Sequence, residues 1–269
     1  MKILRILFFS WFILASVSCS TVELTGRKQL NLIPETEMIA MSFSQYDEFL
    51  KSHERSRDTE AVAMVKRVGG RIAQAVEEYF REKGMSGRLK DYHWEFNLVE
   101  SPEVNAWCMP GGKVVVYTGL LPVAKNDTGL AVVLGHEIAH AIARHGNERM
   151  SQQLMAQLGG MALSEALRNK PQETRQLWMT AFGVGAQYGV LLPYSRLQES
   201  EADHLGLIFM ALAGYDPHAA LTFWERMAAA SQGTKPPEFM STHPSDRTRI
   251  QNIRKLLPEV IRKYYKPST

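Results

Sequence analysis

Eleven consecutive residues near the middle of the chain read Val132-Val133-Leu134-Gly135-His136-Glu137-Ile138-Ala139-His140-Ala141-Ile142. Apart from two histidines and one glutamate, every residue in this segment is apolar or glycine, which indicates a helix buried in a core. Histidines four residues apart lie one above the other on the same face of a helix. Burying such polar groups without partners is costly. The segment therefore predicts that these three side chains belong to one functional site inside the protein.

The spacing is typical of a metal site with a base beside it. The rings of His136 and His140 can both reach one zinc ion, and Glu137 then lies next to the ion rather than on it. Zinc lowers the pKa of a bound water to about 7. A carboxylate at this position can take a proton from that water and later pass it to a leaving amine. We expect one zinc ion per chain, with Glu137 as the general base of a hydrolysis.

A catalytic zinc needs a third protein ligand. His145 lies on the expected continuation of the same helix, rotated away from the two ligand histidines, which favours a surface position or one behind the ligands. Glu199 and Glu201, in a later helix, are the other candidates, and their spacing alone does not decide between them. Glu199 and Asp203 are four residues apart on one face, so one can be a ligand and the other can orient a ligand histidine. Glu201 points away from that face and fits a solvated charge.

Further motifs occur in order along the chain: Thr25 to Leu32, Asn105-Ala106 followed by Pro110-Gly111-Gly112, Tyr117 to Leu121, Gly135 to His140 followed by Arg144-His145, and Ser195-Arg196 followed by Glu199 and Ala202-Asp203. Together they resemble the M48 family of zinc metallopeptidases over nearly the whole chain. The resemblance is strongest to the branch of bacterial outer-membrane quality-control proteases and mitochondrial OMA1-like enzymes. It implies that Glu199 is the third zinc ligand, and it gives Asp203 a catalytic or proton-donor role.

The rest of the pattern predicts an α+β fold. Helical spacing of apolar residues dominates, and strands are expected at residues 94–99, 105–109 and 113–118. We therefore expect a mostly helical zincin of the gluzincin type, with a small antiparallel sheet and the histidine-bearing helix at its centre.

His243 is a further candidate, in a loop before the last expected helix. It has two possible functional roles: stabilising the oxyanion of the transition state, or occupying the open zinc position and holding the enzyme latent. The simpler alternative is that it only fixes the loop. Members of the resembled family carry a similar His-Pro pair here. Arg247 and Arg249 are candidates to pair with the Asp203 region.

The strand around Asn105, Ala106 and Trp107 is a candidate substrate site. An extended peptide can add to a sheet edge through backbone hydrogen bonds, with little selectivity for sequence. Packing in the core is an equally good explanation for Trp107.

The first residues indicate targeting. Two positive charges precede an apolar run from Ile6 to Val17, which is too short to span a membrane. A small residue then precedes Cys19. We expect residues 1–18 to be a signal peptide of the lipoprotein type, with ordinary signal cleavage or an uncleaved anchor as alternatives. Residues 19–30 are then a tether and residues 31–269 the peptidase domain. A lipid on Cys19 would place the protein in the periplasm, anchored at the outer membrane.

Composition narrows the function further. The net charge of +3 is spread along the chain and gives no case for nucleic acid as a partner. Cys108 is the only other cysteine, so no disulfide framework is expected. We expect a zinc endopeptidase acting on misfolded or misassembled cell-envelope proteins. The alternatives are a zinc-containing periplasmic chaperone or assembly factor with little proteolytic activity, and a hydrolase of small amides or esters. Glu137 favours the enzyme, because a binding module needs no base. The oligomeric state is not indicated.

Overall fold

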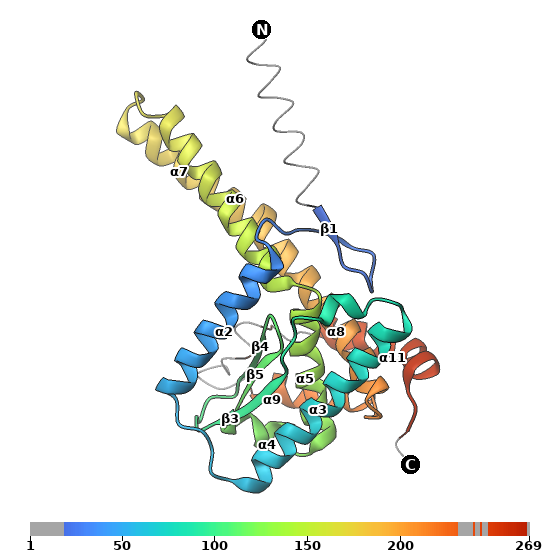
Figure 1. The fold of residues 1–269 in the computed structure, drawn as a ribbon. Helices are drawn as coiled ribbons and strands as arrows, with labels where there is room; N and C mark the ends of the chain where they lie inside the picture. Colours follow the sequence, from blue (N-terminus) through green and yellow to red (C-terminus); the bar gives the residue numbers. More distant parts are fainter. Residues whose placement is uncertain (1–18, 231–238, 240–242, 244–246, 268–269) are drawn as a thin grey trace. The chain divides into compact units, whose positions relative to one another are not determined.

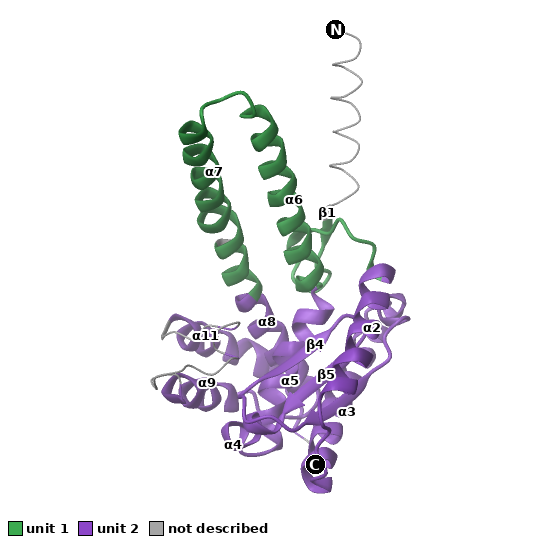
Figure 2. Cartoon of the chain, turned by 90° about the vertical axis from the view of Figure 1, so that its left-hand side faces the viewer, with its two compact units in different colours: residues 1–35, 144–198 green, residues 36–143, 199–269 purple. Residues whose placement is uncertain are grey.

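The computed structural model describes residues 19–230, 239, 243 and 247–267 (Figure 1). The signal peptide predicted for residues 1–18 lies outside the described residues. The chain forms two compact units (Figure 2). Unit 1 comprises Met1–Glu35 and Arg144–Gln198, and unit 2 comprises Thr36–Ala143 and Glu199–Thr269. The chain is mostly helical with small sheets, so the predicted fold class is confirmed.

Unit 2 contains a three-stranded sheet in the order β3-β5-β4, made of β3 (Glu95–Val99), β4 (Ala106–Met109) and β5 (Lys113–Tyr117). β4 and β5 form an antiparallel hairpin, whose turn contains Gly111 and Gly112 at φ 84° and 85°. Such positive values favour glycine. β3 pairs with β5 in parallel, so the sheet is mixed rather than wholly antiparallel as expected. Alternation along the sequence predicts strands but not their spatial order, which depends on the hairpin inserting β5 between its two neighbours.

Helices surround this sheet. α3 (Thr59–Glu82) begins at Asp58, whose carboxylate accepts hydrogen bonds from the amides of Glu60 and Ala61. α2 (Glu35–Ser52) contributes Tyr46 to an apolar cluster with strand residues such as Val115. The remaining elements of unit 2 are η1 (Ser86–Leu89), η2 (Thr118–Leu120), α4 (Leu121–Ala124), α9 (Ala219–Ala230) and α11 (Arg247–Tyr264).

Two helices position the candidate site through residues that belong to unit 2. α5 (Asp127–Ile142) is buried at every residue from Gly129 to its end. It crosses α8 (Leu192–Leu212) at a pair of glycines. A Cβ on Gly135 would lie 2.8 Å from the carbonyl oxygen of Gly206, and a Cβ on Gly206 would lie 2.9 Å from the amide nitrogen of His136. The two backbones therefore touch, which brings residues on the preceding turns of α8 against the histidines of α5.

The helix that carries the histidines is shorter than the continuous one expected. Arg144 adopts a left-handed conformation, with φ 59°, and ends the run after Ala143. α6 (His145–Ala166) begins at the next residue as a separate helix. His145 is consequently not on a continuation of α5, and it is completely buried rather than at the surface.

Unit 1 contains a small sheet and a pair of long helices. Residues 19–30, predicted as a tether, include the antiparallel strands β1 (Cys19–Thr21) and β2 (Lys28–Leu30). α6 and α7 (Gln172–Ala186) run side by side, coloured green in Figure 2. A π-helical turn, η3 (Gln187–Leu191), connects α7 to α8. None of the described helices combines the length and hydropathy needed to cross a membrane.

Candidate metal centre

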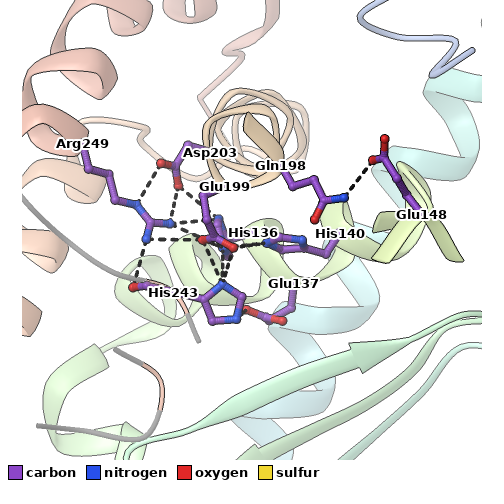
Figure 3. A network of polar contacts seen from close by, with 9 residues as sticks. All are labelled: His136, Glu137, His140, Glu148, Gln198, Glu199, Asp203, His243 and Arg249. Atoms are coloured by element: carbon purple, nitrogen blue, oxygen red, sulfur yellow. Dashed lines mark hydrogen bonds and ion pairs between the residues drawn. The ribbon is translucent and has the colours of Figure 1, made fainter. Parts of the chain in front are cut away.

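Four buried side chains of unit 2 converge on one point (Figure 3). His136 and His140 come from α5, Glu199 comes from α8, and His243 comes from the segment between α9 and α11. One nitrogen or oxygen atom from each of the four lies within 4.8 Å of all the others. The structure thus brings together the two histidines and the glutamate predicted as metal ligands, and adds His243 to them.

The distances between these atoms fit one tetrahedral ion. His136 Nε2 lies 3.1 Å from both His140 Nε2 and His243 Nδ1. Glu199 Oε2 lies 2.9 Å from His243 Nδ1 and 3.3 Å from His136 Nε2. Zinc bonds of about 2.0–2.1 Å in tetrahedral geometry would place ligand atoms about 3.3 Å apart. Three imidazoles and a carboxylate are also a donor set that zinc accepts. The residues present therefore fit a bound metal ion.

The charges at this point are strongly coupled. Burial alone would raise the pKa of Glu199, but His140, His136 and His243 hold it well below its usual range. Burial alone would lower the pKa of His136, but the carboxylates of Asp203 and Glu199 raise it to about 9. Without a metal, the carboxylates thus favour a proton on His136, where an ion would otherwise supply the positive charge.

Asp203 lies behind His136 rather than in front of it. Its Oδ1 is 3.0 Å from His136 Nδ1, on the side of the ring away from the ligand group. Arg249 donates to both carboxylate oxygens of Asp203, at 2.8 and 2.6 Å, and its guanidinium lies 3.4 Å from the ring centre of Trp224. Burial alone would raise the pKa of Asp203, but Arg249 and His136 lower it, so the group stays ionised. This geometry supports the orienting role, since an Nδ1–H donated to Asp203 directs Nε2 of His136 at a metal. The proton-donor role stays a prediction.

His243 lies between the ligand group and the expected base. Its Nδ1 points at the ligands, whereas its Nε2 is 3.5 Å from Glu137 Oε1. Its amide donates to the carbonyl of Phe239, whose ring stacks on the imidazole at 4.6 Å. Arg249 also donates to the carbonyl of His243, at 3.3 Å. This position suits a fourth ligand better than a donor to an oxyanion.

The predicted substrate strand is an edge strand. Among the described residues, β4 pairs only with β5. The indole of Trp107 packs edge-on against Tyr46 and Phe49, so its side chain belongs to the core. β4 also lies close to the expected base, because the charge of Glu137 adds to burial in raising the pKa of the Cys108 thiol. The structure therefore places β4 against α5 and near Glu137, whereas the side chain of Trp107 packs in the core.

The sequence did not predict that some of the residues around the metal centre would lie there. Trp224 and Phe239 both pack against the ring of His136, yet an aromatic residue in an apolar helix normally indicates only core. Arg249 was a candidate partner of Asp203, but its stacking on Trp224 could not be read from spacing. Glu201, expected to be solvated, is buried.

Two histidines four apart on a buried helix, a glutamate from a later helix and a second glutamate beside them define a metallopeptidase of the zincin class. The model of "Peptidase family M48" matches residues 66–257. The chain belongs to this family, as its motifs suggested.

Named relatives support this assignment. The chain is 39% identical over 189 residues to the mitochondrial metalloendopeptidase OMA1 of Schizosaccharomyces pombe, covering 70% of this chain and 52% of the relative. It is 30% identical over 246 residues to the OMA1 of Homo sapiens, covering 89% of this chain and 46% of the relative. It is 31% identical over 169 residues to the β-barrel assembly-enhancing protease of Escherichia coli K12, covering 60% and 34%. The chain thus spans about half the length of these relatives, or less.

The comparisons contradict the predicted location. Periplasm with a lipid anchor at the outer membrane was expected, but the relatives of higher identity are named as mitochondrial proteins. The prediction was wrong because it rested on a short basic and apolar N-terminal segment. Such a segment shows that a chain is targeted more reliably than it shows the destination.

Proposed function

We propose that this chain is a zinc-dependent endopeptidase that hydrolyses peptide bonds of misfolded or misassembled proteins. The observation that carries the proposal is the convergence of His136, His140 and Glu199 on one point, with Glu137 beside it. Bound zinc would polarise the scissile carbonyl and lower the pKa of water. Glu137 takes the proton of the attacking water and returns it to the leaving amine. Asp203 holds His136 in the tautomer that binds metal.

The edge of β4 supports the choice of unfolded polypeptide as substrate. An extended peptide can pair with this strand through its backbone, which requires no particular sequence. Folded proteins rarely offer an unpaired extended segment, whereas misfolded ones do. The proposal does not extend to cell-envelope proteins as substrates, because that substrate class followed from the predicted periplasmic location, which the relatives contradict.

We propose further that the structure represents a latent state. The ring of His243 lies between the ligand atoms and Glu137, where an attacking water would have to be. Substrate cleavage then requires His243 to move away from this position.

The alternative is a metal-containing chaperone or assembly factor that binds clients at the edge of β4 without cutting them. The name of the Escherichia coli relative combines assembly and proteolysis, since it is an assembly-enhancing protease. The proximity of Glu137 to the ligands favours catalysis, because holding a client does not need a base there.

The proposal is tested with the purified protein and unfolded casein. We expect about one zinc per chain and slow cleavage. Glu137→Gln should keep the zinc and reduce cleavage by at least about a hundredfold, since it removes a general base. Normal cleavage by this variant would overturn the mechanism. Full zinc content after replacing both His136 and Glu199 by Ala would overturn the ligand assignment.

A second variant separates latency from inactivity. His243→Ala should keep zinc and cleave casein faster than the unmodified chain. Slower or equal cleavage would show that His243 does not hold the enzyme latent. If neither protein cleaves casein while both prevent its aggregation, the chaperone alternative is correct.

A further inference from the structure

Exposed apolar side chains are concentrated in one part of the molecule. Of the large hydrophobic residues that are exposed in the described chain, all but Met41 lie between Met150 and Leu197. Four of the five exposed hydrophobic residues of α6, namely Met150, Leu154, Leu158 and Met161, lie on one side of the helix, and Met155 is exposed away from them. Leu177 and Val184 of α7 and Tyr188 of η3 form a similar stripe, with Trp178 beside it. We call these two stripes the hairpin surface. A concentration of exposed apolar side chains on a helix pair indicates a surface that binds a protein or a membrane.

Long stretches of the same helices contain no charged residue on any side. Residues 150–164 and 176–195 contain no Asp, Glu, Lys or Arg, which leaves uncharged stretches of 15 and 20 residues. As helix these stretches are about 22 and 30 Å long. A helix that packs on a protein partner through one face usually carries charges on its other faces. These two helices therefore suit an environment that is apolar along their length.

Charges occur at both ends of the uncharged stretches, and most are positive. Arg149 and Arg196 lie at one end, and Arg168, Lys170 and Arg175 lie at the other. The carboxylates near them are Glu173, Glu165, which pairs with Arg168, and Glu148, which pairs with Arg27, so the cations outnumber the carboxylates even when the pairs are left out. Cations at the ends of an apolar helix pair complement the anionic headgroups of a lipid surface.

Two other features of unit 1 agree with a lipid environment. In the sequence, the apolar run Ile6 to Val17 closely precedes β1, which belongs to unit 1. In addition, a cavity of about 610 Å³ lies where α6, η3 and β2 meet, lined by apolar side chains such as Leu30, Met155, Phe182 and Leu191. A volume of this size accommodates an acyl chain.

We propose that the hairpin surface docks into an anionic lipid bilayer. The apolar stripes of α6 and α7 lie in the boundary between headgroups and acyl chains, and the cations at the two ends contact lipid phosphates. A second copy of the chain is the other possible cover for these stripes. The cations at both ends of the uncharged stretches favour the bilayer, because they complement anionic lipid phosphates and would repel the same cations of a second copy.

The test measures the depth of individual positions, so that membrane binding by the N-terminal run does not affect the result. Leu158→Cys and Val184→Cys are labelled with an environment-sensitive fluorophore in full-length protein carrying Cys19→Ser and Cys108→Ser. Met41→Cys is the control, because Met41 is also a large exposed hydrophobic residue but belongs to unit 2. Vesicles of phosphatidylcholine with phosphatidylglycerol are compared with vesicles of phosphatidylcholine alone.

We expect the labels at positions 158 and 184 to become brighter with the anionic vesicles and to be quenched by lipids that carry a nitroxide on the acyl chain. The label at position 41 should do neither. Leu154→Glu with Leu177→Glu should reduce vesicle binding by the hairpin at least about tenfold, because two charges enter the apolar boundary. The zinc content should not change, since all four ligands are in unit 2.

Two results would overturn the proposal. One is a bound protein whose labels at positions 158 and 184 stay in water and unquenched. The other is a dimer, detected by light scattering without lipid, that the two glutamate substitutions dissociate, because a second copy would then cover the hairpin surface.

Discussion

Arg249 connects several parts of the metal centre, and its Nη1 also lies 3.6 Å from Glu199 Oε2. Two of its nitrogens hold Asp203, which orients His136, and a third holds the carbonyl of His243. Its guanidinium stacks on the ring of Trp224, which holds it in this position. The side chain of Arg249 therefore holds His136, through Asp203, and also His243, which we propose must move before substrate is cleaved.

Replacing Arg249 should weaken metal binding. Arg249→Lys keeps the charge but cannot bridge both oxygens of Asp203 with a planar fork. We expect zinc affinity to fall about 10- to 100-fold, as happens when the partner of a ligand histidine is disturbed. Competition with a chromogenic chelator measures this. Arg254→Lys, on an exposed face of the same helix, is the control, and equal affinities for the two variants would contradict the role of Arg249.

Cys108 offers a pH-dependent probe of the site. Burial and the negative charge of Glu137 raise the pKa of its thiol well above 9.0, so the thiol stays protonated at pH 8. We expect alkylation in a Cys19→Ser background to be far slower in the folded protein than in denaturant, with the rate rising only above pH 9. Glu137→Gln should accelerate it by removing the negative charge. Identical rates in folded and unfolded protein at pH 8 would exclude this environment.

At the scale of elements, the crossing of α5 and α8 decides whether the ligands meet. Gly206→Ala would place a Cβ 2.9 Å from the amide nitrogen of His136 and 3.0 Å from the carbonyl carbon of Gly135. Backbone atoms cannot rotate away, so the helices must separate. We expect a loss of about 1–3 kcal/mol in the free energy of unfolding, measured with urea, together with weaker zinc binding.

Gly70→Ala in α3 is the matched control for this substitution. A Cβ there meets no atom within 4 Å. The change should be neutral, or stabilising by up to about 1 kcal/mol, because alanine is the better helix former. If both alanine variants lost the same stability, the close crossing would not be the cause.

The elements also show how far the sequence could be interpreted. The spacing of His136 and His140 predicted two ligands and the buried helix, because both depend on local periodicity. The ligand role of Glu199 needed the resemblance to a family, since spacing did not separate it from Glu201. The order of the strands and the break at Arg144 depend on contacts between distant residues, which periodicity does not contain.

At the scale of the molecule, the metal ligands are confined to one of two compact units. Removing zinc with a chelator should therefore affect unit 2 alone. A hundredfold excess of metal over its Kd stabilises a fold by about 2.7 kcal/mol, so chelation should lower the unfolding temperature by several degrees. Hydrogen exchange should accelerate in α5 and in residues 199–212, while α6 and α7 keep their rates. Equal acceleration in α6 and α7 would show that the two units unfold together.

The contacts at the base of the α6–α7 hairpin determine how far its length can vary between related chains. Glu148 accepts two hydrogen bonds from Arg27 and one from Gln198, each 2.8 Å long, so the beginning and the end of the excursion through residues 144–198 are tied together by their own side chains. Closing a loop four times shorter or longer changes its entropy cost by only about 1 kcal/mol. Insertions and deletions in the hairpin should therefore be tolerated, and its length can diverge freely between related chains while the ligands on either side keep their places.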